Sequence, residues 1–387
     1  MHTKKIGLRF LVPFLLAALS FAFAAIPTVS AQQAVSVQKS GTFTGGTPRF
    51  VTLNHNVRMS SLARTNSSGM VDTIPYWSDL FNVNGNPYPF QMVGTNPANG
   101  SHRTTVPTEI IALKTVFSDG NALNGADNVK NTVNSPLFEN AQYTSGNTQY
   151  GDAIQRAEFW HYVKNHQGYH VLLGDPKVLH TVTLTIPAAD GQTGISKRTG
   201  ALIGLIDIDW FDAQIQTLML QLHISPKTLP IFLTSNVFLY ENGDPTQCCV
   251  IGYHSAVFSV NGSGRSQIQT YAWGSYTTPG IFSVPIDDIN GLSHEIAEWY
   301  NDPFIDNVTP YWESPIAPQY GCNNFLEVGD PLVGVAFTVK TDGKKYHPQD
   351  EAFFSWFAQQ TPSLGIHHQY TYLGTFTSSA AASSCTP

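Results

Sequence analysis

The stretch Leu292–Phe304, which reads LSHEIAEWYNDPF, brings together groups that bind metals and move protons. On a helix, positions four apart differ by about 40° around the axis, so His294, Glu298 and Asp302 would share one face. Glu295 would lie about 100° round from His294, beside that face. An imidazole and a carboxylate one turn apart can bind a single divalent cation, and a neighbouring carboxylate can accept a proton. The segment therefore predicts a metal-binding helix.

The spacing matches the H-E-x-x-H metal helix, except that Glu298 stands where a second histidine is usual. Zinc accepts carboxylate oxygen as well as imidazole nitrogen, and catalytic zinc sites have three protein ligands and one open position. The added negative charge would make a bound water less acidic, which increases the dependence on Glu295 as base. Only nine glutamates occur in the chain, and four of them fall between positions 295 and 327, which favours a site over a solvated acidic face.

The third metal ligand is expected downstream of the helix. Glu327, in the run NNFLEVGDP, is the preferred candidate, and Asp330 in the same run is the neighbouring alternative. Asp302 lies on the ligand face of the helix and could support the ligands. It could also simply end the helix, because Pro303 follows directly. His254, in the run GYHSA on an expected strand, is interpreted as a supporting or alternative ligand.

Residues 1–31 are interpreted as a signal peptide. A basic start precedes an apolar run that is short for a membrane span, and the small residues Val29-Ser30-Ala31 follow it as a cleavage signal. The mature chain would then begin near Gln32, and the protein would be secreted, extracellular or periplasmic. In such a compartment cysteines form disulfides. Because adjacent cysteines rarely bond each other, each of Cys248 and Cys249 is expected to pair with Cys322 or Cys385.

The charge balance excludes two classes of partner. Charged residues make up 12% of the chain, against roughly 25% in typical soluble domains. The formal net charge is −7 and no basic block occurs, so we expect neither nucleic acid nor an anionic membrane surface as partner. After the leader, no stretch is apolar enough to cross a bilayer. The oligomeric state is not indicated.

The order of expected elements is that of an α+β protein. Residues 32–148 read as an irregular β-rich region, 149–375 as the metal-binding domain and 376–387 as a flexible tail. In the second region we expect helices at 153–166, 210–224 and 286–301, with Asp209 capping the middle one. Strands are expected at 199–209, 229–240, 248–260 and 268–276, so that a helix, then strands, then the helix of the candidate site follow one another, which is an α+β order.

The helix GLSHEIAEWYNDP, the preceding GYHSA and the downstream LEVGDP together resemble the zincin metallopeptidases. The run H-E-I-A-E, followed by D-P and E-V-G-D, is also similar to bacterial secreted proteins distantly related to the plant exordium-like (phosphate-induced) extracellular proteins. The resemblance covers about residues 200–340. It implies a zincin-like domain, with a mixed sheet and an active-site helix. It also implies zinc ligands at His294, Glu298 and Glu327, with Glu295 as the base.

Two functions follow as hypotheses. The first is a secreted zinc-dependent hydrolase, most naturally a peptidase acting on peptides or proteins, with Glu295 as general base. The second is a non-catalytic extracellular protein that keeps a structural or vestigial metal site. A metal-free glycosidase with two carboxylates is disfavoured because the histidine at position 294 would have no role in it. A serine hydrolase is disfavoured because the chain lacks G-x-S-x-G.

Overall fold

A computed structural model describes residues 41–43, 46–51, 53–54, 71–260, 264, 266–379 and 385. The expected signal peptide lies outside the described residues, as does part of the expected tail. Residues Gln38–Pro387 form one compact unit. The α+β class is confirmed, since the described chain mixes helices with a larger share of strands.

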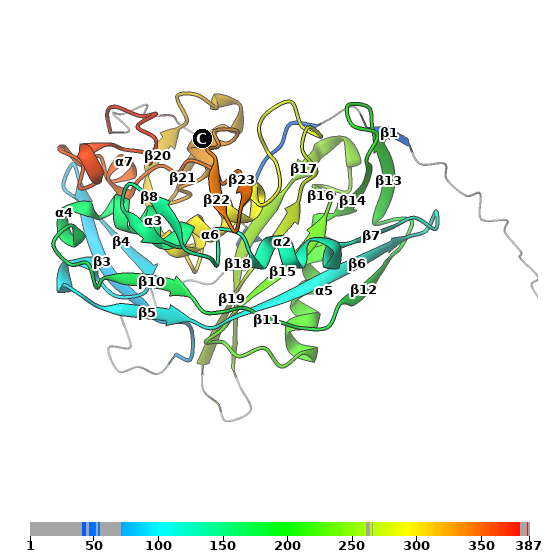
Figure 1. Ribbon diagram of the computed structural model, residues 1–387, viewed down its shortest axis with the longest axis horizontal. Coiled ribbons are helices and arrows are strands. Elements are labelled where there is room, and N and C mark those ends of the chain that lie inside the picture. The colour runs from blue at the N-terminus through cyan, green and yellow to red at the C-terminus, as the bar shows by residue number, and fades with distance from the viewer. Residues whose placement is uncertain are drawn as a thin grey trace, which may run out of the picture. The chain divides into compact units, whose positions relative to one another are not determined.

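An eight-stranded sheet forms the centre of the fold (Figure 1). Most side chains of its middle strands are buried on both faces, as expected for a sheet covered on both sides. Strand β15 runs parallel to β6 and β19, and β18 runs antiparallel to β19. The order is β11 (Lys177–Val178), β6 (Thr108–Phe117), β15 (Leu229–Ser235), β19 (Ser266–Tyr276), β18 (Gly252–Val260) and β2 (Leu53–Asn54), with β7 (Ala122–Asn124) and β12 (Val182–Ile186) also paired to β6.

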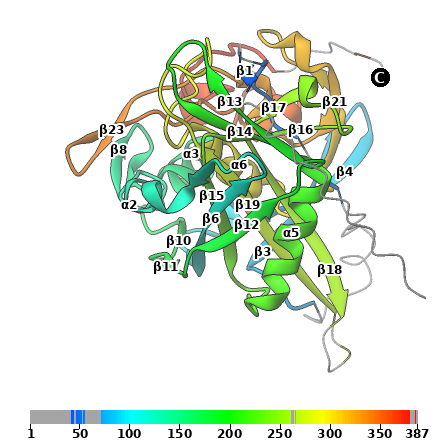
Figure 2. The same cartoon turned by 90° about the vertical axis from the view of Figure 1, so that its right-hand side faces the viewer.

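Two helices cover opposite faces of this sheet. Alternate side chains of its strands divide between two hydrophobic clusters, because successive residues of a strand point to opposite faces. Helix α5 (Ile208–Gln221) packs on the face of Tyr253 and Trp273, and Figure 2 shows it along the strands. Helix α6 (Asn290–Asn301) packs on the face of Ala256 and Ala272. His254 has the same parity as Ala256, so β18 directs it towards α6.

A second sheet of five strands contains β1 (Gly41–Phe43), β13 (Gly191–Ser196), β14 (Leu202–Asp207), β16 (Val237–Tyr240) and, last in the order, β17 (Cys248–Val250). The expected strand 229–240 is wrong as one element, because β15 and β16 belong to different sheets. Asn236 between them has a φ of 52°, a left-handed conformation that asparagine tolerates. That turn sends the chain from the first sheet into the second.

The remaining strands pair in short units. Five two-stranded sheets accompany the two larger ones in the described chain. Strand β6 comes from the expected N-terminal region, and so it shares a sheet with strands of the expected metal-binding domain. The pairs are β3 (Tyr76–Val83) with β4 (Asn86–Val93), β5 (Arg103–Val106) with β10 (His170–Leu173), β8 (Ala141–Tyr143) with β9 (Gly146–Thr148), β20 (Val308–Glu313) with β21 (Cys322–Phe325), and β22 (Val339–Thr341) with β23 (Lys344–Tyr346).

The other helices are short. They are α2 (Val129–Val133), α3 (Tyr150–Glu158), α4 (Trp160–Val163) and α7 (Phe354–Phe357). The single helix expected at 153–166 is therefore two, because Phe159 between them leaves helical geometry. The expected cap of α5 is also wrong: Asp207, not Asp209, accepts a hydrogen bond from the amide of Trp210 at 3.0 Å. In the described part of the chain, no helix combines the length and apolarity needed to cross a membrane.

The disulfide pairing differs from the expected one. Cys248 and Cys249 bond each other, and Cys322 bonds Cys385. The Cα atoms of Cys322 and Cys385 are 5.7 Å apart, within the usual range for a disulfide. The expectation that each adjacent cysteine pairs with a distant one is therefore wrong. The Cys322–Cys385 bond ties the C-terminal end to β21, beside the loop that carries the downstream acids.

Candidate metal centre

Helix α6 packs closely against β18 and β19 because glycines face it. A Cβ atom at Gly274 would lie 2.9 Å from Cβ of Leu292, and one at Gly252 would lie 2.7 Å from Cγ of Glu295. Neither position has room for a larger side chain. The helix therefore lies close enough to the sheet for its acidic side chains to reach His254 on β18.

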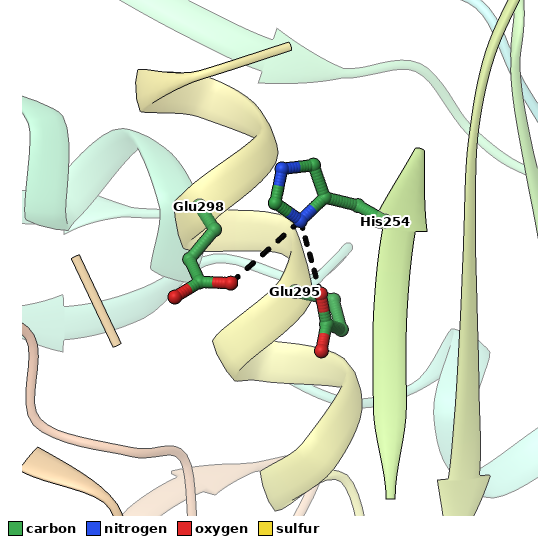
Figure 3. Close-up of side chains that lie close together, drawn as sticks. All are labelled: His254, Glu295 and Glu298. Atoms are coloured by element: carbon green, nitrogen blue, oxygen red, sulfur yellow. Dashed lines mark hydrogen bonds and ion pairs between the residues drawn. The ribbon is translucent and has the colours of Figure 1, made fainter. Parts of the chain in front are cut away.

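His254 connects the strand to the helix (Figure 3). Its Nδ1 lies 3.0 Å from Oε2 of Glu295 and 3.6 Å from Oε2 of Glu298. Its Nε2 lies 3.2 Å from the carbonyl oxygen of Asp302. Because a carbonyl oxygen only accepts, Nε2 carries the proton and donates it to Asp302. That bond orients the ring so that Nδ1 faces both carboxyl groups, an arrangement typical of supported metal-ligating histidines.

A second group forms on the other side of Glu298. Nε2 of His294 lies 3.0 Å from Oε1 of Glu298 and 3.7 Å from Oδ1 of Asp330. The donor atoms of His294, Glu298 and Asp330 all lie within 4.8 Å of one another, and so do those of His254, Glu295 and Glu298. Glu298 belongs to both groups because its two oxygens face opposite histidines.

The donor spacing suits a small divalent cation. Zinc bonds of 2.0–2.2 Å at a tetrahedral angle separate their donor atoms by about 3.3–3.6 Å, close to the 3.0 and 3.7 Å from His294 to Glu298 and Asp330. Among the described residues, Nε2 of His294 and Oε1 of Glu295 complete no hydrogen bond of good geometry. Buried polar atoms without such partners are uncommon, and a cation would satisfy them. Buried His, Glu and Asp groups here could therefore hold a metal ion.

Burial and mutual repulsion disfavour ionised carboxylates at this place. Burial raises the pKa of Glu298 to about 8. Burial, then the charges of Glu298 and Glu327, raises the pKa of Glu295 well above its usual range. The pKa of Asp330 rises well above its usual range for the same two kinds of reason. Within the described part of the chain, Glu295, Glu298 and Asp330 form ion pairs with histidines alone. A cation would stabilise the ionised forms.

The two histidines shift the other way. Burial lowers the pKa of His294 to about 4, against the opposing charge of Asp330. Burial also lowers the pKa of His254, and the charge of Glu327 opposes this. With its Nε2 proton donated to Asp302, a neutral His254 presents the lone pair of Nδ1 towards the carboxyl group of Glu295. Neutral imidazoles are the form that binds metal.

Glu327 and Asp330 reach the centre from one loop and make different contacts. A hydrogen bond links the carboxyl groups of Glu327 and Glu298. Oδ1 of Asp330 approaches His294. Between them the amide of Gly329 donates to Oε1 of Glu298 at 3.1 Å. A Cβ at Gly329 would lie 2.4 Å from Nδ1 of His294, so only glycine lets the loop approach this closely.

Asp302 supports the centre from the end of α6 without joining either donor group. Its carboxyl oxygens accept hydrogen bonds from the amides of Asp306 and Asn307 at 3.1 Å, which close the turn after the helix. Its carbonyl oxygen accepts from His254, as described above. Both contacts fix the chain direction where the helix ends.

Sequence reasoning missed two contributors to the site. The ring of Phe50 stacks on the imidazole of His294, with centroids 3.5 Å apart and planes at 11°. Phe50 lies in a glycine- and threonine-rich run far from the helix in sequence, where no periodicity marks it. Gly252 is the other, because a single glycine in a strand can mark close backbone approach but does not name the partner. No protein-family model matches this chain, and neither a curated protein nor a solved structure matches it.

Proposed function

We propose that the chain is an exported zinc-dependent hydrolase of peptide bonds. His294, Glu298 and Asp330 would hold the ion, and Glu295 would act as general base. The observation that carries the proposal is the convergence of these three donor atoms on one point, with Glu295 next to His294 on the same helix. The zincin resemblance of the helix sequence points the same way.

The donor set favours zinc over the other common divalent ions. Calcium and magnesium prefer shells made of oxygen alone, and magnesium keeps several waters. Zinc binds mixtures of imidazole nitrogen and carboxylate oxygen, with three protein ligands in catalytic sites. One imidazole and two carboxylates from His294, Glu298 and Asp330 fit that composition.

Asp330 is the better third ligand, and Glu327 the better support. Oδ1 of Asp330 lies within 4.8 Å of the donor atoms of both His294 and Glu298. The Glu327 carboxyl is engaged with that of Glu298, and such outer contacts orient a ligand and raise its basicity. The site would then use both acids of the LEVGDP run in different roles.

A zinc ion bound there would supply Lewis-acid chemistry, polarising a substrate carbonyl and acidifying a water molecule. Glu295 would take a proton from the attacking water as its oxygen bonds to the carbonyl carbon. The same carboxyl group would return that proton to the amine as the carbon–nitrogen bond breaks. His254 would position Glu295 through the 3.0 Å contact, and Gly252 would leave the space that its side chain needs.

Access to this chemistry would come from the side of Asp330. Its side chain is 19% exposed, whereas those of His294 and Glu298 are nearly or fully buried. A cavity of about 550 Å³ reaches Asp330 and is also lined by Tyr320 and Glu241. Pockets of about this volume bury drug-sized ligands. Export is supported by the Cys322–Cys385 disulfide, since disulfides persist in oxidising compartments.

The test combines metal analysis with hydrolysis of a peptide library. The wild-type protein is expected to bind one zinc per chain and to cleave peptides, with Glu295→Gln retaining the zinc and losing about 10²–10⁴-fold in rate. Glu139→Gln, at an exposed glutamate, is the matched control and should change neither quantity. A protein that binds no zinc refutes the proposal. Zinc binding that stabilises the fold without any hydrolysis assigns the site to a structural role instead.

A further inference from the structure

The described residues 46–51 pair with β17 and Ile251 at the edge of the second sheet through main-chain hydrogen bonds and one β-bridge. The amide of Cys249 donates to the carbonyl of Thr47 at 3.2 Å, the amide of Arg49 donates to that of Cys249 at 2.9 Å, and the amide of Ile251 donates to that of Arg49 at 3.1 Å. The pairing at Arg49 and Val250 is parallel. These bonds involve main-chain atoms alone, as when an extended peptide adds to a sheet edge.

The side chain of Phe50 covers the candidate metal centre. Its ring stacks on His294, as described above, and is 7% exposed. It also belongs to a small hydrophobic cluster with Cys249 and Ile251 of the neighbouring chain. A flat aromatic ring on a ligand imidazole occupies the space that a bound substrate would need on this side of His294.

Polar contacts on both sides of Phe50 hold the segment beside the cavity that reaches Asp330. The guanidinium of Arg49 lies 2.7 Å from Oε2 of Glu241 and also donates to the carbonyl of Gln247. The hydroxyl of Tyr320 donates to the carbonyl of Pro48. Arg49, Phe50, Glu241 and Tyr320 line the cavity that leads to Asp330. Both partners of the Arg49–Glu241 pair are about 30% exposed, so water competes for this contact.

We infer that the segment Gly46–Val51 occupies a groove along β17 in which the protein binds an extended peptide, and thereby covers the face of His294 on which Phe50 stacks. The ligand class is a peptide whose main chain pairs with β17, with a basic side chain towards Glu241 and the following aromatic side chain over His294. The regulatory consequence for hydrolysis rests on the proposed function; the groove and its occupant do not.

Competition between the segment and a free peptide makes the inference testable. A tethered segment acts at an effective concentration of about millimolar, so a free peptide of the same sequence should bind the wild type poorly. Removing the Phe50 ring should weaken the binding of the tethered segment, because burial of an aromatic side chain contributes strongly to the stability of a contact. The free peptide then meets a weaker competitor for the same main-chain bonds.

The experiment measures binding of fluorescently labelled Gly-Thr-Pro-Arg-Phe-Val, the sequence of residues 46–51, to the full chain by fluorescence anisotropy. Phe50→Ala is expected to bind it about tenfold or more tightly than wild type. Phe43→Ala is the matched control. It removes a ring of β1 that stacks near Phe238 of β16, and this variant should bind the peptide as the wild type does. A peptide with alanine in place of phenylalanine should bind Phe50→Ala more weakly than the parent peptide.

Two outcomes would overturn the inference: equal binding by wild type and Phe50→Ala, or binding by neither. Circular dichroism establishes that each variant is folded, and Phe50→Leu, which keeps an apolar side chain, serves if Phe50→Ala does not fold. Phe50→Leu should bind the peptide between wild type and the alanine variant. Peptide binding without hydrolysis would leave the groove standing and remove the hydrolase proposal. Hydrolysis at equal rates in wild type and Phe50→Ala would keep the hydrolase proposal and contradict a blocking role for the segment.

Discussion

The pH dependence of stability tests whether the buried carboxyl cluster is built for a cation. With metal removed by a chelator, Glu298 has a pKa of about 8 in the folded chain against 4.5 in the unfolded chain. The folded state then binds more protons than the unfolded state between these values, so stability is fully present below pH 4.5 and is lost as pH rises through 8. The buried histidines act in the opposite direction, but only below their usual pKa of 6.5.

The window from pH 6.5 to 8 therefore isolates the carboxyl groups. In this range Glu298 is protonated in the folded state and ionised in the unfolded state, so the free energy of unfolding falls by about 1.4 kcal/mol for each pH unit. This residue therefore accounts for a loss of about 2 kcal/mol across the window. Glu295 and Asp330 add to the loss in the same direction. With zinc bound the carboxylates are already ionised, and the loss should disappear.

The assay is urea denaturation of the chelated protein at several pH values across this window, with and without added zinc. Glu298→Gln has no proton to lose at that position and should show a shallower decline. Glu139→Gln, at an exposed glutamate, should follow the wild type. The reasoning is refuted if the chelated wild type gains stability with pH in this window, or if Glu298→Gln declines as steeply.

Four further variants address the ligands and the loop that carries them, each measured by calorimetric zinc titration. Asp330→Asn should weaken zinc binding by more than about 100-fold, whereas Glu327→Gln should weaken it by about 10–100-fold, the range for outer partners of a ligand; the reverse order would make Glu327 the ligand. Gly329→Ala should weaken zinc binding because its methyl group would displace His294, whereas Gly41→Ala, with open space around it, should have no effect.

The site helix was predictable because its chemistry is local. His294, Glu295 and Glu298 lie within one and a half turns, and helix periodicity alone places them on adjacent faces. The expected helix 286–301 corresponds to α6, with the start shifted to Asn290. His254 was also predictable as a neighbour, since strand periodicity and position before the helix are both visible in the sequence.

The parts that failed depend on three-dimensional contacts. Whether 229–240 is one strand or two is decided at Asn236, where a single left-handed residue sends the chain into another sheet. The stacking of Phe50 on His294 depends on a pairing between the N-terminal segment and β17. Main-chain pairing of this kind leaves no residue pattern, because every amino acid except proline supplies the same donor and acceptor.

Glutamate at position 298 has a physical reason that a histidine would not satisfy. A carboxylate offers two oxygens, and here Oε1 faces His294 while Oε2 faces His254. The same group also receives the amide of Gly329 and the carboxyl of Glu327. A neutral imidazole has one donor nitrogen and one acceptor nitrogen, so it could bind a metal and make a single further contact. Glu298 therefore joins the strand histidine, the helix histidine and the downstream loop, and its negative charge would favour a cation there.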